Sequence, residues 1–167
     1  MDASSFSNLI KQLGEDTAVT GILALQPLPR GISREHLSDL MPPGKDVDGV
    51  SFSQQGRLAL GQPDIAPSTP LGGLLLLRHY GIEVAGRHAV VIGRSPVVGR
   101  PLALLLLAAD ATVTICHSRT RNLADITRQA DILLAAAGQP GLVTPDMVKP
   151  GAVVVDFGVS VIDGKLV

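Results

Sequence analysis

Residues 89–101 read AVVIGRSPVVGRP, an apolar run that ends in a glycine turn and leads into a second apolar segment. Short apolar runs of this kind are typical of buried strands, and residues 98–109 have the composition of the helix that follows. Gly93 lets the chain leave the strand sharply, and Gly99 lets backbone approach a ligand or a neighbouring strand closely. The start of such a helix offers free N–H groups and a partial positive charge to a phosphate. The segment therefore predicts a phosphate-binding turn, with a purely structural strand-to-helix turn as the alternative.

The same alternation continues downstream. Further strand candidates lie at residues 112–116, 132–135 and 152–156, with a helix candidate at residues 122–129 and a short turn after Thr144. Thr144-Pro145-Asp146 has the order of an N-cap, a proline at the first helical position and an early acid. Strands that alternate with helices form right-handed βαβ units. Residues 81–167 are thus expected to fold as an α/β domain with a Rossmann-like parallel sheet.

The sequence before residue 81 is less regular and predicts a separate region, residues 1–80. Helix candidates lie at residues 9–13, 33–41 and 69–80, with Ser33 as an N-cap, and residues 21–25 are a strand candidate stopped by Pro27 and Pro29. Residues 42–70 are rich in Gly, Pro and Asp, which is typical of a loop, with a short hairpin at residues 52–60. Near the end of the chain, Asp163-Gly164 is a hairpin-turn signal.

The composition excludes several classes of protein. The net charge of −1 provides no electrostatic basis for binding nucleic acid or an anionic membrane. The single cysteine, Cys116, excludes an intrachain disulfide and a multi-cysteine metal site. The apolar run at residues 102–109 is too short to cross a bilayer, and the polar segment after Met1 is unlike a signal peptide. We therefore expect a soluble cytoplasmic protein without a metal site.

The end of the second strand of the sheet decides between cofactors. In NAD-binding folds an acid near this point holds the ribose 2′-hydroxyl. Here the strand ends in Cys116-His117-Ser118-Arg119-Thr120-Arg121, which contains hydroxyl and guanidinium groups and no carboxylate. Such groups suit the 2′-phosphate of NADP, and Arg94 would lie near enough to join them. The sequence favours NADP, with a solvated surface loop as the alternative.

Two residues of this segment have structural explanations. His117 could shuttle a proton, but no partner carboxylate is evident, so we interpret it as a positioning or packing residue. Cys116 is expected to be a small buried hydrophobic residue.

Taken together, several motifs resemble the bifunctional methylenetetrahydrofolate dehydrogenase/cyclohydrolase family. The segments that carry the resemblance are Gly21-Ile22-Leu23 with Pro27-Leu28-Pro29, Lys45-Asp46-Val47-Asp48-Gly49, Pro67-Ser68-Thr69-Pro70, Gly93-Arg94-Ser95 with Val98-Gly99-Arg100-Pro101, and Cys116-His117-Ser118-Arg119-Thr120. They follow one another in the family's order over nearly the whole chain. In this loop Ser95 stands where the usual dinucleotide fingerprint has its middle glycine.

The resemblance implies a function in one-carbon metabolism, which serves purine and amino-acid biosynthesis. In that family NADP oxidises 5,10-methylenetetrahydrofolate to the methenyl compound, which is hydrolysed to 10-formyltetrahydrofolate in a cleft between a catalytic domain and a nucleotide-binding domain. The residues implied for NADP are Gly93, Arg94, Ser95, Ser118 and, through its backbone, Val159. Asp48 is implied as the ligand of the pterin ring, because a carboxylate can accept from adjacent N–H donors. Without the resemblance, Asp48-Gly49 would be interpreted as a turn.

The sequence departs from the family's pattern in three places. The family's catalytic lysine follows a tyrosine by four positions, whereas Tyr80 is the only tyrosine here and is followed by Val84 at that spacing. A Pro-Gly-Gly-Val-Gly segment is also absent, so the chain is interpreted as truncated at both ends, with residues 1–80 the remaining C-terminal part of an α/β catalytic domain. The strand glutamine, Gln26, is shifted by one residue. Because side chains alternate along a strand, its catalytic role is in doubt unless a bulge restores it.

Three functions remain in competition. The first is an NADP-dependent enzyme of this family, which would form homodimers as its members do. The second is a catalytically incomplete NADP-binding fragment or module without the lysine. The third is another Rossmann oxidoreductase, such as a relative of shikimate dehydrogenase, which has no reason to contain the motifs at residues 45–49 and 67–70. Without the lysine, hydrolysis should be lost first, because it needs a positioned acid or base.

Overall fold

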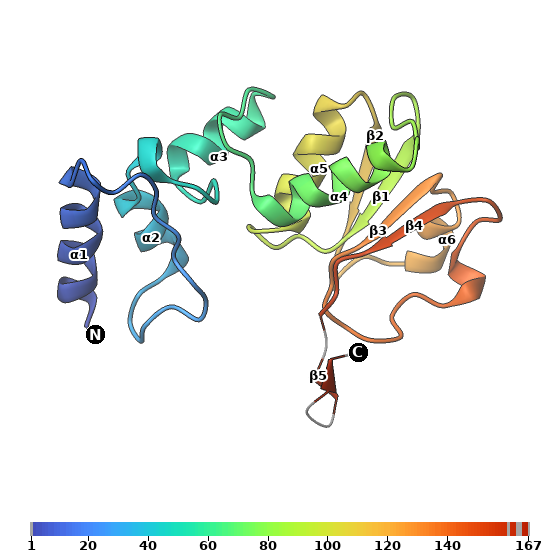
Figure 1. The fold of residues 1–167 in the computed structure, drawn as a ribbon. Coiled ribbons are helices and arrows are strands. Elements are labelled where there is room, and N and C mark those ends of the chain that lie inside the picture. The colour runs from blue at the N-terminus through green and yellow to red at the C-terminus, as the bar shows by residue number, and fades with distance from the viewer. Residues whose placement is uncertain (1, 160, 163–164, 167) are drawn as a thin grey trace. The chain divides into compact units, whose positions relative to one another are not determined.

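The structure is a computed structural model that describes residues 2–159, 161–162 and 165–166. The chain divides into two compact units, Met1–Ser68 and Thr69–Val167 (Figure 1). The change of unit falls at the start of helix α4, whereas the sequence pattern placed the boundary after it, at residue 80. Each unit has its own core.

The first unit consists of short helices. They are α1 (Ala3–Glu15), α2 (Arg34–Leu40), the 3₁₀ helix η1 (Pro43–Lys45) and α3 (Phe52–Ala59). Side chains cap the helix starts: the Asp2 carboxylate accepts the Ser5 amide at 2.8 Å, and the Ser33 hydroxyl accepts the His36 amide at 3.1 Å, as expected for an N-cap. The core of this unit contains the buried side chains of Phe6, Ile10, Ile22, Ile32, Leu37 and Met41.

Two sequence-based predictions for the first unit are wrong. Residues 52–60 form helix α3 instead of a hairpin, because the Ser51 hydroxyl accepts the Gln54 amide at 3.3 Å and starts a helix. Residues 21–25 form no strand beyond a single parallel bridge between Ile22 and Asp46. The segment then runs into Pro27 and Pro29, which have no amide hydrogen with which to extend a ladder.

The second unit is the expected parallel α/β domain. Its elements are α4 (Ser68–His79), β1 (His88–Ile92), α5 (Gly99–Ala108), β2 (Thr112–Cys116), α6 (Leu123–Thr127), β3 (Ile132–Ala135), the 3₁₀ helix η2 (Pro145–Met147) and β4 (Val153–Asp156). The four strands pair in parallel in the order β2-β1-β3-β4. The predicted strands are confirmed to within one residue at each end.

The sheet is covered on both faces. Adjacent residues Ala89, Val90 and Val91 of β1 are all fully buried, although neighbouring side chains on a strand point to opposite faces. Helix α5 packs against β1 and β2, while Leu123 and Ile126 of α6 pack against a cluster that contains Val90 and Leu133 (Figure 1). Burial on both faces explains why β1 and β3 are continuous apolar runs instead of alternating ones, whereas β2 and β4 are partly exposed.

Polar contacts join the strands at the amino-terminal edge of the sheet. Asp131 accepts the Lys149 ammonium at 2.6 Å and the His88 amide at 3.0 Å. The Lys149 contact, followed by the His88 amide, holds the pKa of Asp131 below its ordinary value. The His88 ring also reaches Thr114 of β2 at 2.9 Å, so this edge is tied across three strands.

The remaining local predictions have mixed outcomes. The predicted turn after Thr144 forms as η2, but Thr144 does not cap it through its side chain, since its hydroxyl lies 2.6 Å from the Asp146 carboxylate. Strands β5 (Val161–Ile162) and β6 (Lys165–Leu166) pair antiparallel, while the predicted turn at Asp163-Gly164 itself falls outside the described residues. Within the part of the chain that the structure describes, no helix is both long and apolar enough to span a membrane.

Candidate functional site

The strand order creates a topological switch point in the second unit. From β1 the chain crosses to β2 on one side, and β3 then pairs with β1 on the other side. The connections that leave the carboxyl ends of β1 and β3 therefore diverge. In open parallel sheets, ligands bind in the crevice at such a point.

A pocket of about 330 Å³ lies at this position. Its lining includes Gly93, Arg94, Ser95 and Ser118, which are four of the five residues expected to bind a dinucleotide. The rest of the lining comes from Ile92, His117, Leu123, Ala136, Ala137, Gln139 and Leu142. Two turns that are separated in the sequence, after β1 and after β2, thus contribute polar groups to one concave surface.

The hydrogen bonds of Ser95 contradict the expectation that the start of α5 offers free N–H groups to a phosphate. The start of α5 does not offer free amides, because the Ser95 hydroxyl accepts the amides of Val98 at 3.1 Å and Gly99 at 3.2 Å. The Ser95 carbonyl accepts the next amide, that of Arg100, at 3.0 Å. A hydroxyl that accepts two hydrogen bonds still has its own proton to donate. Ser95, which lines the pocket, therefore interacts with the start of α5 through its hydroxyl oxygen and has one O–H group left to donate.

The two glycines of the turn are required by the protein's own packing. A Cβ atom on Gly99 would lie 2.2 Å from the carbonyl oxygen of Gly93. Gly93 has φ +131° and leaves no space for a Cβ atom, which would lie 2.5 Å from the Ala136 oxygen. The close approach that the glycines permit is between β1, the loop after β3 and the start of α5. Their spacing is thus explained without a ligand.

The turn after β2 is held by its own hydrogen bonds. The His117 amide donates to the Thr120 hydroxyl at 2.8 Å, and the Thr120 amide donates to the His117 carbonyl at 2.8 Å. Ser118 and Arg119 are exposed between these anchors. Cys116 is fully buried, as expected, and burial raises the pKa of its thiol.

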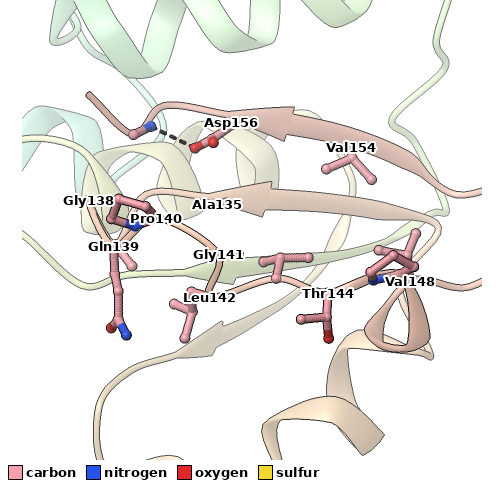
Figure 2. Close-up of a pocket in the computed structure, with 14 residues that line it drawn as sticks. Ala135, Gly138, Gln139, Pro140, Gly141, Leu142, Thr144, Val148, Val154 and Asp156 are labelled. Atoms are coloured by element: carbon pink, nitrogen blue, oxygen red, sulfur yellow. Dashed lines mark hydrogen bonds between the residues drawn. The ribbon is translucent and has the colours of Figure 1, made fainter. Parts of the chain in front are cut away.

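A second pocket of about 580 Å³ continues along the same edge of the sheet (Figure 2). It lies between the loop after β3 and the residues Val154, Asp156 and Gly158 in and after β4. Gln139 and Leu142, whose side chains point to the same side of that loop in Figure 2, line both pockets. The carboxyl edge thus carries two adjoining cavities of predominantly small and apolar lining.

Val159 follows the turn after β4 and is 72% exposed. The Asp156 carboxylate accepts the Gly158 amide at 2.7 Å and shapes this turn. Phe157 packs against α4, where a Cβ atom on Gly73 would lie 2.2 Å from the ring. Val159 is not among the lining residues of either pocket, so its backbone contact with a cofactor stays a prediction.

In the first unit, the loop that contains Asp48 is organised by a buried carboxylate. Asp46 is 0% exposed and accepts three backbone amides. They are those of Asp48 at 3.3 Å, Val50 at 3.1 Å and Ser51 at 2.7 Å. Ser51 and Gln54, 1% and 3% exposed, complete a buried polar cluster. Lys45 caps the end of α1 by donating to the carbonyls of Leu13 at 2.9 Å and Asp16 at 2.5 Å.

Asp48 itself is half-buried at the turn. One carboxylate oxygen accepts the Ser68 hydroxyl at 3.1 Å. The next residue, Gly49, has φ +64°, and a Cβ atom there would lie 2.8 Å from the Ile65 carbonyl oxygen. Asp48 and Gly49 therefore form a turn. This turn also carries a carboxylate whose second oxygen can accept a hydrogen bond from a ligand.

Gln26 lies in an irregular, exposed segment. The structure places no strand there, so the alternation argument that questioned its orientation does not apply. Its catalytic role stays a prediction.

Asp46, Ser51 and Gln54 were not predicted from the sequence. A signal for the last two was present, because Ser51 followed three residues later by Gln54 has the spacing of a capping box. Asp46 had no local signal, since its burial depends on contacts made elsewhere in the unit. The loop residues Gln139 and Leu142 were missed for the same reason.

The fold and the pocket at the switch point define a dinucleotide-binding domain of the Rossmann class. Residues 67–167 match the family described as "Tetrahydrofolate dehydrogenase/cyclohydrolase, NAD(P)-binding domain". The chain therefore belongs to this family, and the resemblance seen in its motifs is confirmed.

Relatives extend the match to the whole chain. The "Bifunctional protein FolD" of Thermomicrobium roseum is 77% identical over 167 residues, which are 100% of this chain and 58% of that protein. The crystal structure of the FolD enzyme from Campylobacter jejuni, at 43% identity, superposes with a TM-score of 0.96 over 100% of this chain and 60% of that one. The Trypanosoma brucei enzyme, solved with NADP and an inhibitor, is 37% identical with a TM-score of 0.91 and matches 97% of this chain and 56% of its own. The chain thus spans less than two thirds of the length of these relatives.

Proposed function

We propose that the second unit binds NADP in the pocket at the switch point. The observation that carries the proposal is the convergence of Gly93, Arg94, Ser95 and Ser118 on one cavity at the carboxyl ends of β1 and β2. Arg94 and Ser118 are exposed and can reach a phosphate from two sides, and Ser95 has a hydroxyl proton to donate. Val159 is proposed to contact the cofactor through its backbone.

The reaction proposed for the whole protein is that of its relatives. NADP, when bound, accepts a hydride from 5,10-methylenetetrahydrofolate, and the resulting methenyl compound is hydrolysed to 10-formyltetrahydrofolate. Asp48 would hold the pterin ring, because its second carboxylate oxygen can accept a pterin N–H while Ser68 holds the first. Gln26 is proposed as a further substrate contact. In this proposal residues 1–80 supply folate contacts and residues 81–167 bind the cofactor.

Exchanging Arg94 for alanine tests the cofactor. Loss of a guanidinium that pairs with a phosphate should weaken NADP binding at least about tenfold and change NAD binding much less. Isothermal titration of the chain with each dinucleotide provides both affinities. Arg87→Ala is the matched control, because Arg87 carries the same charge but lines a different pocket, at the amino edge of the sheet. Equal affinity of the unmodified chain for NADP and NAD would contradict the proposed roles of Arg94 and Ser118.

One sequence feature favours binding without efficient turnover by these 167 residues alone. The family's tyrosine and its lysine four positions later belong upstream of the Gly-Ile-Leu segment, and the only tyrosine here, Tyr80, has no lysine at that spacing. Because hydrolysis needs a positioned proton donor or acceptor, we expect NADP binding with little or no production of 10-formyltetrahydrofolate. The loss of methenyl absorbance after 5,10-methenyltetrahydrofolate is added measures the hydrolysis. Hydrolysis at the rate typical of complete family enzymes would refute this expectation.

The location, the oligomeric state and the metabolic role of the protein are also proposed from its family. We place it in the cytoplasm as a homodimer that acts on tetrahydrofolate derivatives, with a role in the one-carbon supply for purine and amino-acid biosynthesis. Its net charge of −1 provides no electrostatic basis for a nucleic-acid or anionic-membrane partner.

A further inference from the structure

His117 directly follows β2 and lines the proposed NADP pocket beside Arg94 and Ser118. Its ring is half-buried, between the buried Cys116 and the exposed Ser118. Its sequence context alone indicated a positioning or packing residue. The hydrogen bonds of the turn indicate a more specific role.

The turn holds the imidazole in one orientation. The backbone of His117 is fixed at both ends by Thr120, as described above. In addition, the Arg119 amide donates to Nδ1 of the His117 ring at 3.1 Å. The ring is therefore anchored on the side that faces its own turn.

This contact also determines where the ring carries its proton. A nitrogen that accepts an N–H donor is unprotonated, so in the neutral ring the proton is on Nε2. Among the described residues Nε2 of His117 makes no hydrogen bond, whereas Nδ1 is occupied. His117, which lines the pocket, consequently keeps an N–H donor that no described residue uses.

The position of this donor indicates its partner. At the end of the second strand, NAD-binding folds place an acid that accepts the ribose hydroxyl. This chain places there an N–H donor, the Ser118 hydroxyl and, from the β1 turn, the Arg94 guanidinium. All three groups suit a ligand that presents only acceptor oxygens.

We propose that His117 is a specificity-determining residue whose Nε2–H donates to the 2′-phosphate of NADP. This inference rests on the proposed function and assigns one further contact within it.

Two substitutions separate ligand binding from turn structure. Asparagine at position 117 can place its carbonyl oxygen near the position of Nδ1 and keep the Arg119 contact, but it has no donor at the Nε2 position. Glutamine can place an N–H near Nε2 but leaves the Arg119 amide without its acceptor. His117→Asn should weaken NADP binding about tenfold, leave NAD binding within about twofold and keep the Tm. His117→Gln should stay within about threefold of the unmodified NADP affinity.

The deciding quantity is the ratio of NADP to NAD affinity, measured by titration calorimetry with thermal unfolding recorded for each variant. A lowered ratio in His117→Asn together with a retained ratio in His117→Gln supports the proposal, and every other pattern contradicts it. Titration with 2′,5′-ADP should follow NADP, because the phosphate and not the nicotinamide makes the contact. If the unmodified chain shows no preference for NADP, the proposed function fails. If it prefers NADP and His117→Asn does too, only the role of His117 fails.

Discussion

Replacement of Asp46 by alanine should lower the free energy of unfolding of the first unit by about 4 kcal/mol. The Asp46 carboxylate is fully buried and accepts the amides of Asp48, Val50 and Ser51. Without it these amides lose a charged acceptor at a position that is fully buried, where water does not replace it. Each hydrogen bond to a charged group typically contributes about 1.5–3 kcal/mol, and the three are not independent. Urea unfolding followed by circular dichroism measures the loss.

Asparagine at position 46 should cost about 2 kcal/mol, because its carbonyl oxygen replaces one carboxylate oxygen while its NH₂ group faces another donor. The control is Asp64→Asn. Asp64 pairs with Arg57 at 2.8 Å on the surface of the same unit, and an exposed pair of this kind contributes little, about 0.5 kcal/mol. Hydrogen exchange of the segment from residue 46 to residue 51 should accelerate in both Asp46 variants and stay unchanged in the control. An Asp46→Ala variant as stable as the control would show that the carboxylate does not organise this loop.

The consequence for function is local. Asp48 and its neighbours are held in place by Asp46, so the proposed pterin contact depends on a residue that touches no ligand itself. A change at Asp46 should therefore weaken tetrahydrofolate binding together with the protection of the loop amides.

Gly99→Ala should destabilise the second unit by about 3 kcal/mol. The added methyl group would lie 2.2 Å from the Gly93 oxygen and 2.5 Å from its carbonyl carbon. These are backbone atoms between β1 and α5, so the methyl group can be accommodated only if the helix start moves away from the sheet. The same displacement would widen the pocket and separate Ser95 from the amides that it caps.

Gly72→Ala provides the matched control for this change. Gly72 lies within α4, and a Cβ atom there meets nothing within 4 Å. Alanine is favoured over glycine inside a helix by about 0.5 to 1 kcal/mol, so this variant should be slightly more stable than the unmodified chain. Thermal unfolding of the two variants compares them directly. If both substitutions shift the Tm alike, steric exclusion at Gly99 is not the reason for that glycine.

Local patterns predicted the second unit well and the first unit poorly. Strands such as β1 and β3 are short apolar runs that are bounded by turn residues, and their burial on both faces makes this signal strong. In the first unit, residues 52–60 were expected to form a hairpin, although the two buried side chains, Gln54 and Leu58, have the four-residue spacing of one helix face. Ser51 caps the start of this helix, and a search for strand patterns does not detect such a cap.

Some features of the candidate site could be predicted from the sequence, and others could not. The turn after β1 and the absence of an acid after β2 are readable in sequence, and they led to Arg94, Ser95 and Ser118. The hydrogen bonds that the Ser95 hydroxyl accepts at the start of α5 could not be predicted from the sequence, because they depend on how the turn folds back on itself.

The sequence by itself determined that residues from His88 onward form a parallel α/β unit with a glycine turn and a polar edge suited to a phosphorylated ribose. Those features are local, because they follow from the order of apolar, glycine and hydroxyl residues along a few turns of chain. Only the tertiary structure decided the strand order β2-β1-β3-β4, which brings the turns after β1 and β2 to one pocket. It also decided the burial of Asp46 and the orientation of the His117 ring. These depend on hydrogen bonds and packing that form only when the chain has folded, and no periodicity in the sequence encodes them.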